Sequence, residues 1–273
     1  MTNSETTTQP YTGIDDLTLS LSDGVLSMTL NRPDSLNSLS APMLDTIATA
    51  MEQAATDARV RVVRFGGAGR GFSSGAGISE ADHADQATSN GPDAVLAAAN
   101  RAVRSIVALP KPVVSVVQGP AAGVGVSLAI SADVILASEK AYFLLAFTKI
   151  GLMPDGGASA LVAAAVGRTR AMRMALLAER LTATDALAAG LVSAVYPAEN
   201  LDAAVDGVIE TLKSGPAVAL RKTKQAINAA TLAELEPAFE RETDGQLELL
   251  VSHDFREGAK AFQQRRPATF TDD

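Results

Sequence analysis

The stretch Val113-Val114-Ser115-Val116-Val117-Gln118-Gly119-Pro120-Ala121-Ala122-Gly123-Val124-Gly125 predicts a buried strand that passes through a glycine-rich turn into a helix. Its first part is rich in β-branched residues, as is typical of a strand covered on both faces. The glycines permit a sharp turn and let a ligand approach the backbone closely. The first N–H groups of the helix that follows have no intrahelical acceptor and carry a partial positive charge.

A second stretch has the same design. Arg64-Phe65 ends a predicted strand and leads to Gly71-Phe72-Ser73-Ser74-Gly75-Ala76-Gly77. Two backbone N–H groups that converge on one point would form an oxyanion hole. Taken singly, each stretch is better explained as a tight strand–helix turn. Neither contains a dinucleotide-binding or a P-loop glycine pattern, so a nucleotide-phosphate loop is not predicted.

Composition excludes several classes of function. The chain has 273 residues, of which 47% are hydrophobic and 20% charged, as in ordinary folded proteins. Its 31 acidic and 23 basic residues give a net charge of −8, which argues against a nucleic-acid partner. With no cysteine and only two histidines, no metal site built from these residue types is expected. No apolar run is long enough for a membrane span, and we expect a cytoplasmic protein.

The remaining patterns predict an α/β fold with a helical C-terminal lobe. Strands are predicted over 24–31, 61–65, 113–117, 134–137 and 191–196, an extended piece over 143–147, and helices over 41–57, 93–108 and 124–132. From residue 156 onward nearly all of the chain has helical patterns, including 232–250. We therefore divide the chain into a flexible tail (1–10), a core that carries the site (11–197) and a helical lobe (198–273). Within the core, 79–92 is a polar, turn-rich excursion.

Five segments, in this order, resemble landmarks of the crotonase (enoyl-CoA hydratase/isomerase) superfamily. They are Leu30-Asn31-Arg32-Pro33-Asp34-Ser35-Leu36-Asn37-Ser38-Leu39, Phe72-Ser73-Ser74-Gly75-Ala76-Gly77-Ile78, the stretch from Lys111-Pro112 through the glycine-rich turn to Ala132-Asp133, Ile150-Gly151-Leu152-Met153-Pro154-Asp155-Gly156-Gly157, and Ala186 with Gly190-Leu191-Val192. Each motif alone is weak, but the ordered set is specific and covers about residues 13–270.

The resemblance implies a ββα spiral core with a helical trimerisation lobe, assembled as a homotrimer or a dimer of trimers. It implies an acyl-CoA thioester as substrate and no separate cofactor, because coenzyme A is part of the substrate. By position in the motifs, the oxyanion N–H groups belong to Ala76 and Val124. The family most often has glycine where Val124 stands, but a backbone donor does not depend on the side chain.

The resemblance also bears on the reaction. Family hydratases use two glutamates to hold and activate water, and Ser127 and Phe147 stand at those positions here. The remaining candidate acid is Asp155, which on its own is better explained as a helix N-cap. Its position matches the catalytic aspartate of several branches, including the dienoyl-CoA isomerases and the ring-opening isomerases of the phenylacetate pathway. A carboxyl beside apolar Phe147 and Met153 is expected to have a raised pKa.

We therefore predict an enoyl-CoA isomerase with Asp155 as its acid and base. Two alternatives stay open: an enoyl-CoA hydratase with atypical site residues, and an acyl-CoA-binding protein with weak catalysis.

Further residues are implied as substrate contacts. Family contacts to coenzyme A map to Ser35, Leu36 and Ile78, and Phe147 is expected beside the acyl group. Gly77 stands where the family commonly has aspartate. Near the C-terminus, Phe262 and Arg265 match positions that reach the coenzyme A of a neighbouring subunit. For Arg265, a solvated basic helix end is an equally good explanation.

Overall fold

The computed structural model describes residues 11–77 and 92–271. The predicted tail (1–10) and nearly all of the predicted excursion (79–92) lie outside the described residues. The main sheet has six strands in the order β1-β2-β3-β4-β6-β9. Their bounds are β1 Leu17–Ser22, β2 Val25–Leu30, β3 Val62–Gly67, β4 Val113–Val117, β6 Val134–Ser138 and β9 Ala194–Tyr196. β1 and β2 form an antiparallel hairpin and the other neighbours are parallel, which confirms the α/β class.

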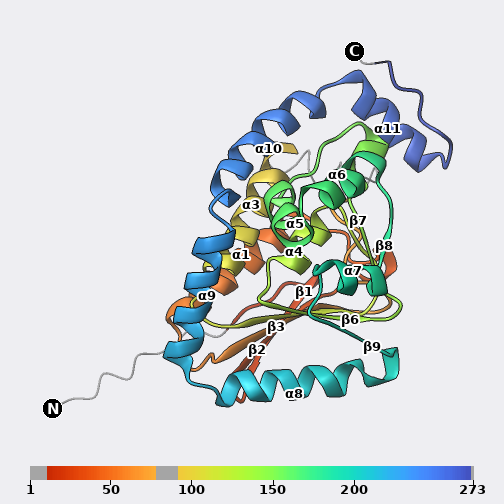
Figure 1. Cartoon of the computed structure of the whole chain (residues 1–273). Helices are drawn as coiled ribbons and strands as arrows, with labels where there is room; N and C mark the ends of the chain where they lie inside the picture. Colours follow the sequence, from red (N-terminus) through yellow and green to blue (C-terminus); the bar gives the residue numbers. More distant parts are fainter. Residues whose placement is uncertain (1–10, 78–91, 272–273) are drawn as a thin grey trace.

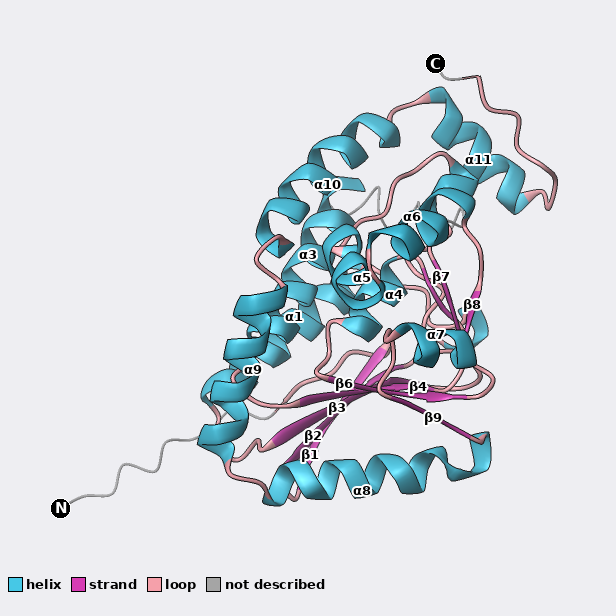
Figure 2. Ribbon diagram, viewed as in Figure 1, coloured by secondary structure: helices cyan, strands magenta, loops and turns pink. Residues whose placement is uncertain are grey.

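Helices cover both faces of this sheet (Figures 1 and 2). On one face, α8 (Leu201–Ser214) packs apolar side chains on β3, β4 and β6. On the other lie α1 (Ala41–Thr56), α3 (Pro92–Ala108) and α4 (Val124–Ile130). Because both faces are covered, the central strands are continuous apolar runs.

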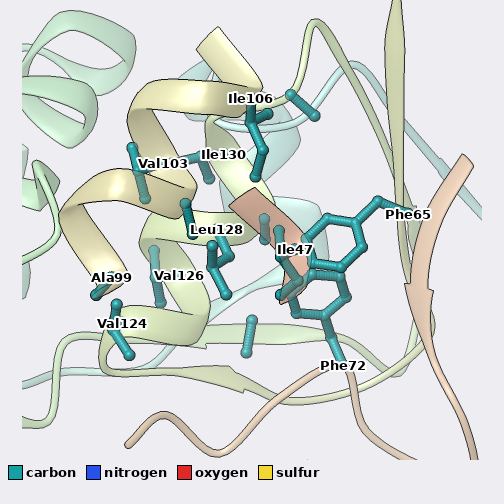
Figure 3. Packing of buried hydrophobic residues seen from close by; sticks show 14 of the residues in the cluster. Ile47, Phe65, Phe72, Ala99, Val103, Ile106, Val124, Val126, Leu128 and Ile130 are labelled. Atoms are coloured by element: carbon teal, nitrogen blue, oxygen red, sulfur yellow. The ribbon is translucent and has the colours of Figure 1, made fainter. Parts of the chain in front are cut away.

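Helix α4, which follows the glycine-rich turn at residues 119–123, is wholly buried. Figure 3 shows its side chains Val124, Val126, Leu128 and Ile130 packed beside α3. Such a fully buried helix cannot shift without opening the core, so it fixes the glycine-rich bend at its N-terminus.

A second, smaller sheet joins the site-forming segments. It consists of β5 (Ala121–Ala122), β7 (Tyr142–Leu144) and β8 (Leu181–Thr182), in that order. An isolated bridge between Ser73 and Ala121 attaches the glycine-rich stretch 71–77 to this sheet, and a second bridge joins Ala76 of that stretch to Leu39. The predicted extended piece 143–147 is wrong at its end, because Phe147 begins the 3-10 helix η2 (Phe147–Ile150). The strand predicted over 191–196 is likewise confined to Ala194–Tyr196.

The second half of the chain is mainly helical, as predicted. The remaining helices are η1 (Pro33–Ser35), α5 (Ala158–Val166), α6 (Arg168–Leu177), α7 (Ala183–Ala189), η3 (Ala198–Asn200), α9 (Ala217–Thr231), α10 (Leu235–Leu250) and α11 (His253–Gln263). α10 contacts α3 and α5, and α11 packs on η2. α10 begins three residues later than predicted. In the described part of the chain, no helix is long and apolar enough to cross a membrane.

Candidate active site

The two glycine-rich bends are residues 71–77, called the first bend, and residues 119–125, called the second bend. They are in direct contact. The Ala122 N–H donates to the Ser73 carbonyl over 2.9 Å. A Cβ atom placed on Gly75 would lie 2.8 Å from the Ala122 oxygen and 3.4 Å from the Gly123 Cα. Gly75 also has a φ of +91°, which L side chains rarely adopt. A glycine is therefore required at this position both for its conformation and for the approach of the second bend.

Each bend presents a backbone N–H that the fold leaves without a backbone acceptor. In the bridge between Leu39 and Ala76, the hydrogen bonds run from Leu39 N to Gly75 O and from Gly77 N to Leu39 O. The Ala76 N–H thus points away from Leu39. Val124 is the first residue of α4, where no intrahelical acceptor exists. Among residues 11–77 and 92–271, neither N–H has a backbone hydrogen bond.

The residues that carry these two amides both adjoin the contact between the bends. Gly75 meets Gly123, and Ala76 and Val124 each follow that contact by one residue. The structure thus brings the two residues that the sequence motifs single out to the same contact. Their role in binding an oxygen remains a prediction at this point.

Two side-chain amides hold the first bend in shape. The buried Asn37 donates through Nδ2 to the carbonyl oxygens of Ala68, Gly71 and Phe72 at 2.9–3.1 Å. Gln118, at the end of β4, donates to the oxygens of Gly67 and Gly71 at 2.6 and 2.7 Å. Neither residue was predicted to have this role, although Asn37 lies in the quoted opening motif.

We expect Asn37→Ala to destabilise the protein by about 2–3 kcal/mol, because buried carbonyls lose their donor. Activity should fall as well, since the bend that carries Ala76 loses its support. Urea unfolding followed by circular dichroism measures the first effect. Asn31→Ala is a matched control, because Asn31 is exposed in the same motif and makes one exposed bond to Asp15 O. Equal stability of the two variants would contradict this role for Asn37.

Asp155 lies in the loop between η2 and α5, with its two carboxyl oxygens in different states. Oδ2 accepts a hydrogen bond of 2.7 Å from Gln246 Nε2. Oδ1 is buried and has no hydrogen-bond partner among residues 11–77 and 92–271. A buried carboxyl oxygen without a partner is costly, and a catalytic role is one recognised explanation for it.

The alternative interpretation of Asp155 as a helix cap is wrong. The N-cap of α5 is Gly157, and the carboxylate that accepts from the helix start belongs to Glu242. Glu242 accepts from Gly157 N at 2.6 Å and from Ser159 N at 2.8 Å. The Asp155 side chain is therefore free of any capping role.

Asp155 is adjacent to the second bend. A Cβ atom on Gly156, which has a φ of +64°, would lie 2.9 Å from Val124 Cγ2 and 3.3 Å from Ser127 Oγ. Ser127 Oγ also donates to the Asp155 carbonyl over 2.9 Å. The loop with the acid is thus packed against the first turn of α4, which carries the Val124 amide.

Burial raises the pKa of Asp155 to about 7, while the hydrogen bond from Gln246 opposes the shift and the nearby Glu242 carboxylate adds to it. A carboxyl with such a pKa can both accept and return a proton near neutral pH. The predicted direction is confirmed.

The two positions where family hydratases have glutamates hold no carboxylate. Ser127 is fully buried in α4 and bonds to the Asp155 backbone. Phe147 is 7% exposed, and its ring edge lies about a contact distance from Gly123, since a Cβ there would be 3.9 Å from Cζ. Phe147 therefore borders Gly123 of the second bend, Ser127 borders the Asp155 loop, and neither side chain can transfer a proton at neutral pH.

The residues predicted to contact coenzyme A fall in different places. Ser35 and Leu36 lie beside the first bend, where Ser74 bonds to both of their carbonyl oxygens at 2.9 and 2.8 Å. Phe262 is 62% exposed near the end of α11, and Arg265 follows it, also exposed. Their contact with a neighbouring subunit stays a prediction. Ile78 lies outside the described residues.

Two polar side chains at the site were not predicted from the sequence. Gln246 and Glu242 come from α10 and are buried against the Asp155 loop. Their four-residue spacing places them on one face of the helix, and buried polar residues at that spacing are the signal that the sequence offered. In the described residues, no group of three or more His, Cys, Asp or Glu side chains could hold a metal ion.

Comparisons with known proteins agree with these motifs. The family model for enoyl-CoA hydratase/isomerase matches residues 20–273. A 1,2-epoxyphenylacetyl-CoA isomerase of Escherichia coli is 37% identical over 91% of this chain and 95% of its own. A probable enoyl-CoA hydratase of Rhodobacter capsulatus is 36% identical over 92% and 96%. The crystal structure of an enoyl-CoA hydratase from Mycobacterium avium subsp. paratuberculosis is 66% identical, with a TM-score of 0.89 over 95% of this chain and 100% of that chain.

Proposed function

Because the chain belongs to the enoyl-CoA hydratase/isomerase family, we propose that it is an enoyl-CoA isomerase. Its reaction would move the double bond of a 3-enoyl-CoA into conjugation with the thioester carbonyl. In this proposal Asp155 is the acid and base, and the amides of Ala76 and Val124 form the oxyanion hole.

The chemistry requires one carboxyl and two amide donors. The carboxylate Oδ1 takes a proton from the α-carbon, and the electron pair of that C–H bond becomes part of a dienolate. Its negative charge rests on the thioester oxygen, where the two amides stabilise it. The same carboxyl then returns the proton to the γ-carbon, and the double bond lies between the α- and β-carbons. No proton or electron is left over.

One observation supports isomerisation above the alternatives: in the described part of the chain Asp155 Oδ1 is a buried carboxyl oxygen without a partner, on a loop packed against the first turn of α4, while Ser127 and Phe147 replace both hydratase glutamates. A hydratase must hold and activate a water molecule, for which two carboxylates serve in that branch. The name of the 37%-identical relative, an isomerase acting on an acyl-CoA, is in line with this choice. Hydratase is the second candidate, because the 66%-identical crystal structure carries that description.

A substrate panel separates these candidates. Purified protein is incubated with 3-enoyl-CoA and with 2-enoyl-CoA of several chain lengths, and double-bond migration and hydration are followed separately. We expect migration with 3-enoyl-CoA and little hydration of 2-enoyl-CoA. Hydration at a rate equal to or above that of migration would overturn the assignment in favour of the hydratase. Binding without either reaction would favour an acyl-CoA-binding protein.

The pH dependence offers a second check. The base must be ionised to accept the first proton, so kcat should fall as pH drops below the Asp155 pKa of about 7. An ordinary aspartate would give a midpoint near 4. A kcat profile that stays flat from about pH 5 to 8 would contradict a base in this environment.

A further inference from the structure

One face of α10 is built around the loop that carries Asp155. Glu242, Gly245 and Gln246 are spaced by three and four residues, so they share this face. Glu242 binds the start of α5, and Gln246 binds the loop at Met153 and Asp155. Gly245 leaves space for the Met153 side chain, because a Cβ atom at position 245 would collide with the Met153 sulfur. A glycine inside a helix costs stability, and this contact explains its presence.

Gln246 is fixed in one orientation by both ends of its amide. Oε1 accepts from Met153 N at 3.2 Å, while Nε2 donates to Met153 O at 3.0 Å and to Asp155 Oδ2 at 2.7 Å. The side chain is 2% exposed. Because its acceptor end is taken by a backbone N–H, the amide cannot flip without losing bonds, and the donor end must face the carboxyl.

From this geometry we propose that Gln246 is a positioning residue that holds Asp155 Oδ2 and thereby makes Oδ1 the oxygen that transfers the proton. The proposal rests on the function proposed above. A carboxyl fixed through one oxygen keeps the other aimed in a constant direction, which both proton transfers require, since the α- and γ-carbons are separate points. The residue acts through Asp155 and does not itself touch the substrate.

Gln246 and Glu242 have opposite electrostatic effects on the acid. The donor hydrogen bond from Gln246 lowers the pKa of Asp155, and the charge of Glu242 raises it. Among the described residues, the polar groups recorded as acting on Asp155 or bonded to it are these two from α10 and the neutral Ser127 from α4. Removing the Gln246 amide should therefore raise the pKa of Asp155, and removing the Glu242 charge should lower it. A purely structural contribution would not produce opposite shifts.

The test measures the titration of Asp155 directly and does not depend on turnover. The Asp155 carboxyl carbon is followed by carbon-13 NMR in the whole protein, with its signal assigned from its absence in Asp155→Asn. We expect Gln246→Met to raise the midpoint by roughly 0.5–1 pH unit. Gln246→Glu, which keeps the shape and adds an acid, should also raise it. Glu242→Gln should lower it.

Thr243→Val is the matched control. Thr243 lies on the same helix and bonds to Asn100 of α3 at 3.1 Å, away from the Asp155 loop. In this variant the titration midpoint of Asp155 should equal that in the wild type. If Gln246→Met and Gln246→Glu both titrate as the wild type does, the proposal is wrong, whatever their thermal stability.

Kinetics then separate this proposal from the function it rests on. With 3-enoyl-CoA, Gln246→Met should lower kcat roughly 10–100-fold with little change in KM, because alignment is lost while binding is kept. A wild type that does not isomerise would refute the proposed function. The NMR result would then still decide whether Gln246 holds the Asp155 carboxyl. An unchanged kcat in Gln246→Met, with an active wild type that requires Asp155, would refute the positioning role alone.

Discussion

Replacing Asp155 with asparagine is expected to lower kcat for 3-enoyl-CoA by about 10²–10⁴-fold, the usual contribution of a general acid–base residue. The amide has nearly the same shape and can still accept from Gln246, so KM should change little. Steady-state kinetics with the wild type and the variant provide the measurement. If Asp155→Asn retains wild-type turnover, a different group transfers the proton and the assignment is wrong.

The same variant should be more stable than the wild type at alkaline pH. The pKa of Asp155 is raised in the folded protein, so between about pH 4 and 7 the folded state retains a proton that the unfolded state releases. The contribution of Asp155 to stability therefore falls as pH rises through that window. It is fully lost above the pKa that Asp155 has in the folded protein. Asparagine does not ionise, so Tm of Asp155→Asn relative to the wild type should rise from pH 5 to about pH 8. A constant difference in Tm would contradict the raised pKa.

Replacing Val124 with proline is expected to lower kcat/KM by about 10²–10³-fold, because it removes one of the two donors. The substitution is compatible with the start of a helix. Val124 is the first residue of α4, where proline is tolerated and no intrahelical bond is lost. The preceding residue is Gly123, with a φ of +54° and ψ of −135°, a conformation open to glycine.

Val124→Ala is the control for the proline variant. It shortens the side chain and keeps the N–H group, so its activity should remain within a few-fold of the wild type. Far-ultraviolet circular dichroism should show that both variants retain their helices. If the proline variant were folded and as active as Val124→Ala, the Val124 amide would have no part in stabilising the oxyanion.

The bends and their order could be predicted from sequence because their signals are local. Glycines follow β-branched runs directly, and the expected helix begins at Val124 as observed. Phe147 was misplaced in an extended piece because its surroundings are apolar in any conformation. The 3-10 helix that it begins packs against α11, which lies about a hundred residues further along the chain.

The support of the acid could not be predicted in the same way. Gln246 lies 91 positions from Asp155, and no local pattern pairs a helical glutamine with a distant loop. Asn37 and Gln118 are similar cases, since each binds carbonyls of a turn that is formed elsewhere in the chain. Local signals thus identify the groups that carry the chemistry, and tertiary packing determines which side chains hold them.

The central claim is that one buried carboxyl carries a proton between two carbons of the same thioester. A 3-enoyl-CoA deuterated at the α-carbon tests it most directly, with the product analysed by NMR and mass spectrometry in ordinary water. We predict a 2-enoyl-CoA in which part of the deuterium has moved to the γ-carbon, and no such transfer with Asp155→Asn. A product hydroxylated at the β-carbon, or migration that proceeds equally well without Asp155, would contradict the account.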